Sequence, residues 1–388
     1  MRDIMKILII SDGDSKYGAA NSLCQMAARL QLKDDIDLTV VLNHESNVSD
    51  FLKAHACKVI ILPYELYCHA YPSKFWKLLI KKPLYAIKYY LSRLLALKKL
   101  QEKIDIERFD LIHSNGNRED FSALISERFN IPLVWHLREF DDLGYKCFYL
   151  RNDYVQLMNR TANVLIAVSD AVMKNWINKG IDEKKIVRVY NGVKMRKSFR
   201  SRLIPLAQKK EIKVIMVGSL QPLKGQMQAI ELMASLKESN QTYCLDFIGD
   251  GSSKYVNQLK NEIKKNKIEE NIRFLGYRTD VFQLLLDYDI GLTCSKDEGF
   301  GRVTAEYMMA GLPVLASNTG ANSELIRDGI DGYLYSYGNI QDMKNKLVRI
   351  INNNLGGMET YKYATANFSD IVNADNIYQI YKKVLQDT

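Results

Sequence analysis

Short apolar runs alternate with helical patterns along the first half of the chain. Six runs of strand type are separated mostly by segments whose apolar residues recur at helical spacing, and the runs cover residues 6–10, 38–42, 59–62, 111–114, 133–136 and 164–169. Nearly continuous apolar strands are typical of strands buried on both faces of a parallel sheet. The first half therefore predicts a doubly wound α/β domain.

The second half repeats this pattern after a segment of weak periodicity. Five further strands are predicted at 213–217, 245–248, 272–275, 290–293 and 314–316, which indicates a second doubly wound sheet. The segment 194–210 indicates an interdomain linker. We predict a first domain over 1–193, a second over 211–370, and an amphipathic helix over 371–388 that can cross back to the first domain.

Composition places few further limits on the chain. Its 388 residues are 47% hydrophobic and 26% charged, as in an ordinary soluble protein of about two domains. No apolar run approaches the roughly 20 residues of a membrane span. The opening strand is too short for a signal peptide, so a cytoplasmic protein is expected. Six cysteines without C-x-x-C spacing indicate packed thiols rather than a metal site or disulfides.

The net charge of +9 is concentrated in two segments. Residues 73–103 contain nine basic residues and one acid, and residues 194–210 contain seven basic residues and none that is acidic. The rest of the chain therefore carries a net negative charge. This distribution excludes a uniformly basic nucleic-acid binder, and no nucleic-acid partner is expected.

The basic segment 73–103 also has an amphipathic pattern. Pro83 divides it, and the apolar positions that follow share one helical face: Leu84, Ile87, Leu91, Leu94 and Leu95. A basic amphipathic helix with aromatic residues is typical of an interfacial membrane anchor. We predict contact with the anionic inner face of a membrane. The alternative is a helix whose apolar face packs in the core and whose lysines are solvated.

The loop between the strand at 290–293 and the next helix has the features of a phosphate site. Gly299 and Gly301 allow backbone amides to approach an anion at a helix N-terminus. Glu298 in the loop and Glu306 in the helix repel phosphate, but an ionised carboxylate accepts hydrogen bonds from hydroxyl groups. A diphosphate between two polyols fits this arrangement, which indicates a nucleotide sugar.

Other candidate residues follow strands in both domains. Lys224, after the strand at 213–217, is placed to meet a phosphate, although the spacing is not that of a Walker loop. In the first domain, the loop that begins at Tyr17 and Gly18 opens a helix. His136, followed by Arg138 and Glu139, ends a strand, and a purely structural histidine is the alternative there.

Together these motifs resemble the retaining GT-B glycosyltransferases of family 4. The resemblance covers nearly the whole chain and rests on motifs at 17–19, 110–114, 132–136, 168–169, 190–193, 218–225, 249–251, 274–276, 298–306, 311–314 and 320–324. It implies two Rossmann-like doubly wound domains that face each other across a cleft. It also implies an enzyme that is metal-independent and needs no cofactor, since lysine and helix-terminus amides stabilise the leaving diphosphate.

The resemblance assigns roles to individual residues. It implies that Glu298 and His136 contact the donor sugar, that Glu306 holds the ribose and that Lys224 holds the diphosphate. The predicted donor site further includes Gly18, Ser219, Gly299, Phe300, Gly301 and Arg302. Acceptor-side residues are Tyr17, Arg138 and Glu139, and no metal ligand is assigned. Two positions depart from the family: many members have arginine in place of Ser219 and a second glycine in place of Tyr17.

The expected function is transfer of a sugar from a nucleotide-sugar donor, with a UDP-sugar favoured, to a membrane-associated, lipid-linked saccharide in cell-surface polysaccharide synthesis. The enzyme is expected at the cytoplasmic face of the membrane. Ser219 leaves open a nucleotide-sugar-binding or regulatory protein with a degenerate site. A GT-B-like nucleotide-sugar epimerase is a further alternative, and it would need no membrane surface.

Overall fold

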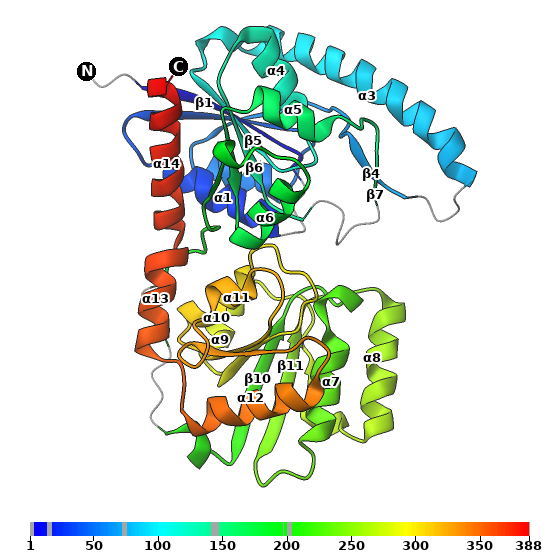
Figure 1. Cartoon of the computed structure of the whole chain (residues 1–388), viewed down its shortest axis with the longest axis vertical. Helices are drawn as coiled ribbons and strands as arrows, with labels where there is room; N and C mark the ends of the chain where they lie inside the picture. Colours follow the sequence, from blue (N-terminus) through cyan, green and yellow to red (C-terminus); the bar gives the residue numbers. More distant parts are fainter. Residues whose placement is uncertain are drawn as a thin grey trace. The chain divides into compact units, whose positions relative to one another are not determined.

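The computed structural model describes residues 4–13, 18–71, 76–140, 147–196, 198–199 and 204–387. The chain forms two compact units (Figure 1). The first consists of Met1–Gly192 together with Asp370–Thr388, and the second of Val193–Ser369. The C-terminal helix is therefore part of the first unit. Tyr17 of the predicted acceptor side and part of the predicted linker lie outside the described residues.

The first unit is built on a seven-stranded parallel sheet with the order β3-β2-β1-β5-β6-β8-β9. Its strands are β1 (Met5–Ser11), β2 (Ile36–Leu42), β3 (Lys58–Ile61), β5 (Leu111–Asn115), β6 (Leu133–Leu137), β8 (Val164–Ala167) and β9 (Ile186–Arg188). All six strands predicted in the first half are confirmed. The apolar run at 7–10 is completely buried, as expected for a strand covered on both faces.

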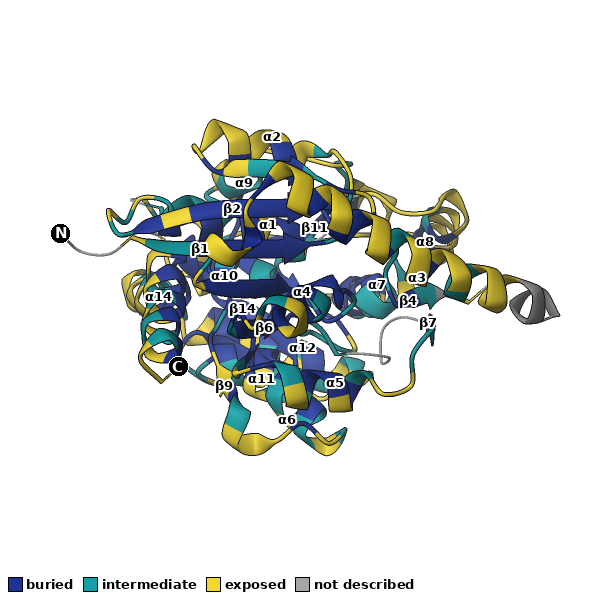
Figure 2. Ribbon diagram, turned by 90° about the horizontal axis from the view of Figure 1, so that it is seen from above, coloured by how far each residue is buried: buried dark blue, intermediate teal, exposed yellow. Residues whose placement is uncertain are grey.

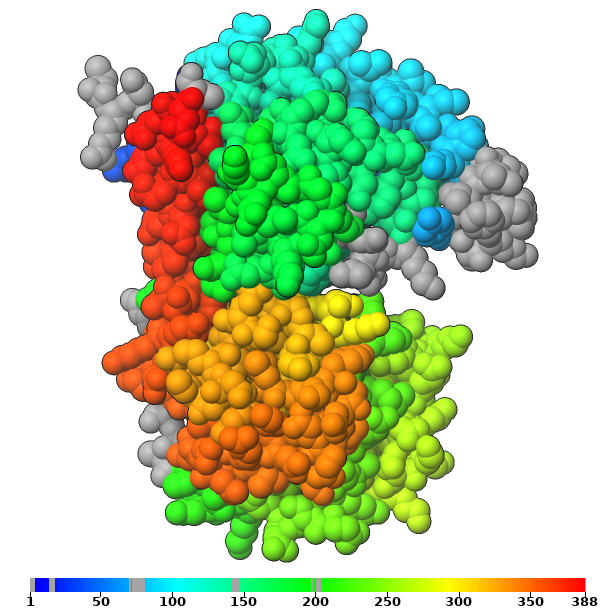
Figure 3. Space-filling model, viewed as in Figure 1, coloured from blue at the N-terminus to red at the C-terminus, as the bar shows by residue number. Residues whose placement is uncertain are grey.

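Helices cover this sheet, and a small two-stranded sheet accompanies it. The helices are α1 (Gly18–Leu30), α2 (Asn47–Ala54), α3 (Trp76–Lys103), α4 (Phe121–Phe129), α5 (Tyr154–Thr161), α6 (Asp170–Asn178) and α14 (Asp370–Asp387), and the small sheet pairs β4 (Cys68–Ala70) with β7 (Cys147–Tyr149). Leu23 and Met26 of α1 share a buried core with Ile377 and Tyr381 of α14. Helix α14 is red in Figure 3 and lies at the surface of this unit.

Helix α3 runs unbroken from Trp76 to Lys103 with Pro83 inside it. The predicted division at Pro83 is wrong, because a proline removes only one backbone hydrogen bond and the turns on either side remain helical. The inner side of the helix carries its buried residues: Tyr89, Arg93, Ala96, Leu97 and Leu100.

The predicted apolar face of α3 is not packed in the core. Its five residues are 57–62% exposed: Leu84, Ile87, Leu91, Leu94 and Leu95. At 3.6 residues per turn they lie on the side opposite the buried residues, and Figure 2 shows exposed residues along the helix. The alternative of a core-packed apolar face is therefore wrong.

The second unit contains a six-stranded parallel sheet with the order β12-β11-β10-β13-β14-β15. Its strands are β10 (Glu211–Val217), β11 (Thr242–Ile248), β12 (Ile272–Phe274), β13 (Ile290–Thr293), β14 (Val314–Ser317) and β15 (Gly332–Tyr335). The five predicted strands are confirmed, and β15 is additional. The chain winds outward from β10 in one direction and from β13 in the other, so the sheet has a topological switch point between these two strands.

Seven α-helices are described in the second unit: α7 (Gln226–Ser235), α8 (Ser253–Asn266), α9 (Val281–Leu285), α10 (Arg302–Met309), α11 (Asn322–Leu325), α12 (Ile340–Asn352) and α13 (Met358–Phe368). Leu206, from the predicted linker, is buried in the core of this unit, and Lys209 forms an ion pair with the buried Asp289. The end of that segment is thus packed structure. Within the described part of the chain, no helix is long and apolar enough to cross a membrane.

Candidate active site

The strongest candidate site lies where the second sheet changes winding direction. The loop after β10 leads through a short 3-10 helix, η4 (Pro222–Lys224), into α7, and the loop after β13 leads into α10. Because β10 and β13 are neighbouring parallel strands, both loops start at the same edge of the sheet. This edge at a switch point is where open α/β sheets bind ligands.

Two predicted site residues from these loops meet directly. Lys224 Nζ lies 2.8 Å from Glu298 Oε2. Gly225 has a φ of +74°, and a Cβ there would lie 2.1 Å from the carbonyl oxygen of Cys294. The amide of Lys296 also donates to the carbonyl of Leu223 at 3.0 Å. Glycine at 225 thus lets the two loops touch, and their contact holds the ion pair in place.

The Glu298 carboxylate is held in its charged form. Burial by itself would raise its pKa, but Lys224, the hydroxyl of Ser295 and the amide of Gly301 outweigh burial, and the pKa is lowered overall. Gly301 caps the N-terminus of α10 at a φ of +79°, a conformation that glycine adopts without strain. An ionised acceptor therefore lies beside backbone amides at the start of a helix.

Glu306 lies one turn into α10. Its Oε1 is 3.6 Å from Arg302 Nη2. Burial raises the pKa of Glu306, and the charges of Arg302 and Arg196 oppose that shift only in part. Phe300 is buried and contacts the ring of Phe368 edge-on, with centroids 6.0 Å apart. Glu306 and Glu298 thus differ in the direction of their pKa shift, although both carboxylates flank the same helix start.

Ser219 lies two residues after β10, in a neutral hydrogen-bond network. Its Oγ accepts from Gln221 Nε2 at 2.9 Å, and its carbonyl accepts from Gln226 Nε2 at 2.9 Å. The position that carries arginine in many family members is therefore uncharged here. Arg302, a nearby cation of the predicted donor site, faces Glu306.

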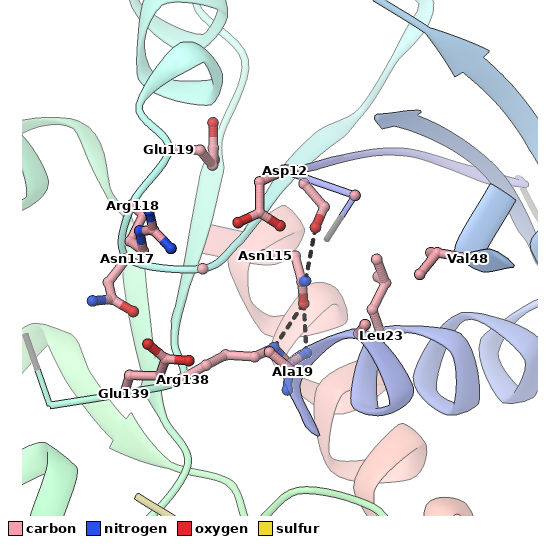
Figure 4. A pocket seen from close by; sticks show the side chains of 14 residues that line it. Asp12, Ala19, Leu23, Val48, Asn115, Asn117, Arg118, Glu119, Arg138 and Glu139 are labelled. Carbon is pink, nitrogen blue, oxygen red and sulfur yellow. Dashed lines mark hydrogen bonds between the residues drawn. The ribbon is translucent and has the colours of Figure 1, made fainter. Parts of the chain in front are cut away.

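The first unit has a separate pocket of about 60 Å³ at the carboxyl ends of its strands (Figure 4). Arg138 and Glu139 both line it. The guanidinium of Arg138 donates to Asn115 Oδ1 at 2.8 Å from Nε and at 2.6 Å from Nη2, and also donates to Asn191. Gly18 begins α1, is exposed and does not line this pocket, whereas the next two residues of α1 do.

His136 lies near the carboxyl end of β6, as the sequence predicted, and its side chain is fully buried there. Its Nδ1 lies 3.3 Å from His113 Nε2. Burial, with Arg138 and His113 nearby, lowers the pKa of His136 well below its ordinary value. The ring is therefore neutral at physiological pH.

Comparison with known proteins identifies the family. A family model described as Glycosyltransferase Family 4 matches residues 18–197, and a model described as Glycosyl transferases group 1 matches residues 199–367. The chain is a GT-B glycosyltransferase.

Individual relatives agree with this assignment. The glycosyltransferase is 28% identical over 254 residues to an uncharacterised glycosyltransferase of Methanocaldococcus jannaschii, covering 64% of this chain and 68% of the relative. It is 24% identical over 275 residues to the UDP-Gal:alpha-D-GlcNAc-diphosphoundecaprenol alpha-1,3-galactosyltransferase of Escherichia coli, covering 67% of this chain and 70% of that protein. Anabaena Alr3699/HepE, solved in complex with UDP, has the same fold, with a TM-score of 0.78, 24% identity, and coverage of 98% of this chain and 100% of that chain.

Sequence reasoning missed polar residues of the glycosyltransferase that line the pocket of the first unit. Asn115 ends β5, Asn117, Arg118 and Glu119 follow it, and all four line the pocket with Asp12. Burial raises the pKa of Glu119 to about 7, although hydrogen bonds from Ser114 and Ser122 oppose the shift. A run of polar residues after a buried parallel strand was the available signal.

The described residues contain no group of three or more histidine, cysteine, aspartate or glutamate side chains arranged to hold a metal ion. Lys224 and the amides at the start of α10 carry positive charge or positive partial charge, which suits a diphosphate. Metal independence remains a prediction.

Proposed function

We propose that this glycosyltransferase moves a sugar from a UDP-sugar to a lipid-linked saccharide held at a membrane, in the synthesis of a cell-surface polysaccharide. The observation that supports it most directly is the Lys224–Glu298 pair beside the N-terminus of α10. A cation, helix-terminus amides and carboxyl acceptors at one edge of a sheet match the diphosphate and hydroxyl groups of such a donor.

The proposed chemistry uses the residues of the second unit. Lys224 and the amides at the start of α10 stabilise negative charge on the diphosphate as its bond to the sugar breaks. Glu298 accepts a hydrogen bond from a sugar hydroxyl, and Glu306 accepts from the ribose. By family resemblance the acceptor attacks from the face that the diphosphate leaves, so the anomeric configuration is retained. No protein nucleophile and no metal are assigned.

Residues of the first unit have supporting roles in this proposal. His136 donates a hydrogen bond to the transferred sugar. Arg138 and Glu139 form the acceptor side through the pocket that they line. Asn115 holds Arg138 in place with two hydrogen bonds, so Arg138 is a rigid wall of this pocket rather than a free diphosphate partner.

The proposed acceptor is held at an anionic membrane surface, at its cytoplasmic face. The E. coli relative is named for a diphosphoundecaprenol-linked acceptor. Helix α3 has an exposed apolar face between Leu84 and Leu95, and the sequence around that face is rich in lysine, which is the pattern of a helix lying in a membrane interface.

A donor panel tests the proposal. The purified enzyme is incubated with UDP-sugars and with sugars on other nucleotides, first alone and then with a diphospholipid-linked saccharide, each with and without EDTA. Slow UDP release without acceptor, faster release with it, an α-linked product from an α-linked donor and insensitivity to EDTA are expected. Binding without turnover would favour a regulatory protein, an isomerised donor would favour an epimerase, and activity lost in EDTA and restored by Mg²⁺ would overturn metal independence.

A further inference from the structure

Three buried side chains form a hydrogen-bonded row inside the first unit. Tyr381 comes from α14, His113 from β5 and His136 from β6, and all three are fully buried. The Tyr381 hydroxyl lies 2.7 Å from His113 Nδ1, and His113 Nε2 lies 3.3 Å from His136 Nδ1. His136 Nε2 has no hydrogen-bond partner among the described residues. The row therefore ends at one unpaired nitrogen.

All three groups are neutral at physiological pH. Burial and the nearby Arg138 lower the pKa of His113 to about 3, and burial lowers the pKa of His136 well below its ordinary value. Burial raises the pKa of the Tyr381 hydroxyl. Each ring of the two histidines therefore carries one N–H hydrogen, and Tyr381 keeps its own.

Two arrangements of these hydrogens preserve both bonds. In the first, Tyr381 donates to His113 Nδ1, His113 donates from Nε2 to His136 Nδ1, and His136 carries its hydrogen on Nε2. In the second, both histidines donate in the opposite direction. In the first arrangement only the His136 Nε2–H is unpaired, whereas in the second the Tyr381 hydroxyl hydrogen and the bare Nε2 of His136 both lack a partner among the described residues. Each buried polar group without a partner costs about 1–3 kcal/mol. The first arrangement is favoured for this reason.

Arg138 lies near the ring of His136, since its charge helps to lower the pKa of that ring. It follows His136 by two residues, directly after the end of β6. Arg138 lines the pocket shown in Figure 4 and is fixed there by Asn115. Buried polar groups are nearly always paired in folded proteins. The unpaired Nε2 of His136 therefore remains able to take one further hydrogen-bond partner.

We propose that Tyr381 and His113 are positioning residues that fix His136 as the Nε2–H tautomer, so that this nitrogen donates to an oxygen of the bound sugar. The assignment of the sugar rests on the function proposed above, whereas the assignment of the tautomer does not. Tyr381 of the C-terminal helix thereby determines which ring nitrogen of His136 carries the hydrogen, although Tyr381 is hydrogen-bonded to His113 and not to His136.

Nitrogen NMR tests the tautomer. The chain has five histidines, so selective ¹⁵N labelling of histidine rings gives few signals, and His136→Gln assigns the relevant pair. In the unmodified protein, His136 should show a protonated Nε2 and a bare Nδ1 from pH 6 to 8. In Tyr381→Phe the two tautomers should mix. A hydrogen on Nδ1 in the unmodified protein, or an unchanged tautomer in Tyr381→Phe, overturns the proposal.

Kinetics test the consequence, with a matched control on the same helix. Tyr378 donates its hydroxyl to Asp35, so Tyr378→Phe also removes one hydrogen-bonded hydroxyl from α14 but leaves the histidine row intact. Tyr381→Phe should lower kcat about three- to tenfold, the size of one ordinary hydrogen bond, with little change in KM for the donor. Tyr378→Phe should leave both constants unchanged. Equal effects in the two variants, at matched thermal stability, would show only a structural role.

Adding UDP-glucose, then other donors, to the labelled protein separates this proposal from the proposed function. A donor that binds should shift the His136 Nε2 signal. If no nucleotide sugar binds, the proposed function fails while the tautomer result still stands. If a donor binds and is turned over but the Nε2 signal does not move, the assignment of His136 to the sugar fails.

Discussion

Lys224 Nζ and Glu298 Oε2 lie 2.8 Å apart, although 74 residues separate them in the chain. They meet because β10 and β13 are adjacent and their loops touch at Gly225. The pair is about a third exposed at the lysine and 17% exposed at the glutamate, so a ligand can reach both groups. Charge placed in advance at the position where a diphosphate leaves lowers the barrier without reorganisation during the reaction.

Replacing Lys224 should reduce turnover by the loss of this charge. Lys224→Ala should lower kcat about 100-fold, within the range seen when one stabilising donor is removed, whereas Lys224→Arg should retain more activity because it keeps the charge. Steady-state kinetics with the donor that the panel selects measure both variants. Equal activity of the alanine and arginine variants would contradict a charge role for Lys224.

The two glutamates should separate binding from turnover. Glu306→Gln should weaken binding of the nucleotide part by about tenfold, and Glu298→Gln should mainly lower kcat, by about 10- to 100-fold, because hydrogen bonds to charged groups contribute roughly 1.5–3 kcal/mol. Calorimetry with UDP and with the UDP-sugar, combined with kinetics, measures the two effects.

A control for the glutamates lies elsewhere in the same unit. Glu262 pairs with Lys265 on the surface of α8. Glu262→Gln therefore removes one paired carboxylate outside the site and should change neither the affinity for the nucleotide nor kcat. Unaltered affinity and rate in both site variants would exclude the assignment of Glu298 and Glu306 to the donor.

Glu119 predicts a pH dependence of stability. Its pKa in the folded protein is about 7, above its ordinary value of 4.5. The folded protein binds this proton more tightly than the unfolded chain, so the stabilisation is fully present below about pH 4.5 and is lost as pH rises through 7. The loss amounts to roughly 3 kcal/mol at most.

Urea unfolding at pH 5 and pH 8 measures this effect. The free energy of unfolding of the wild type should fall relative to that of Glu119→Gln as pH rises, because the glutamine variant cannot ionise. Glu127→Gln, on the exposed side of α4, serves as the control and should follow the wild type. Parallel pH curves for wild type and Glu119→Gln would show that Glu119 is ionised in the folded protein.

The sequence indicated the two sheets well, because buried parallel strands leave continuous apolar runs such as 7–10. The sequence also indicated that Lys224 and Glu298 lie at one edge of the sheet, because the loops that follow parallel strands lie on the same side of that sheet. It did not indicate that His136 is buried, because burial of a strand residue depends on the helix packed over it. Tyr381, which meets His113 there, is 245 residues further along the chain than His136.

Pattern reasoning was also limited for α3 and for the pocket beside Arg138. The spacing of the apolar residues between Leu84 and Leu95 predicted one apolar face. An apolar face that packs in the core has the same spacing as one that stays exposed, so the sequence alone could not distinguish them. The polar run after β5 could be noticed in the sequence. Its role in a pocket depends on the hydrogen bonds between Asn115 and Arg138, which follows the neighbouring strand β6. No short stretch of sequence indicates such a side-chain contact.

The exposed face of α3 predicts binding to anionic membranes. The inner side of the helix is fixed to the unit, since Arg93 donates to the Tyr89 hydroxyl at 2.7 Å and to the carbonyl of Asp120 at 2.9 Å. The outer side presents Leu91 and its apolar neighbours, and lysines lie nearby on the helix: Lys81, Lys82, Lys98 and Lys99. A second copy of this face would bring lysines against lysines, whereas an anionic bilayer complements both the leucines and the charges.

Two sets of changes separate the charges from the apolar face. Reversal of Lys81, Lys82, Lys98 and Lys99 to glutamate should abolish sedimentation with phosphatidylglycerol vesicles, since each lysine near an anionic leaflet contributes about 1 kcal/mol. Changing Ile87, Leu91 and Leu94 to glutamine should weaken binding even at low salt. Binding of the unmodified protein should fall with added salt, because exposed charges are screened over about 8 Å at physiological ionic strength.

A matched reversal controls for net charge. The second unit has four exposed lysines that suit this control: Lys237, Lys254, Lys260 and Lys264. Their reversal changes the total charge by the same amount without altering α3, so vesicle binding should persist.

Turnover on a short soluble acceptor should survive the α3 changes, because Lys224, Glu298 and Glu306 all belong to the other unit. Unchanged sedimentation of the α3 reversal variant would refute the membrane contact. A loss of self-association in the Ile87, Leu91 and Leu94 variant by analytical ultracentrifugation, with vesicle binding intact, would instead assign this face to a second copy of the chain.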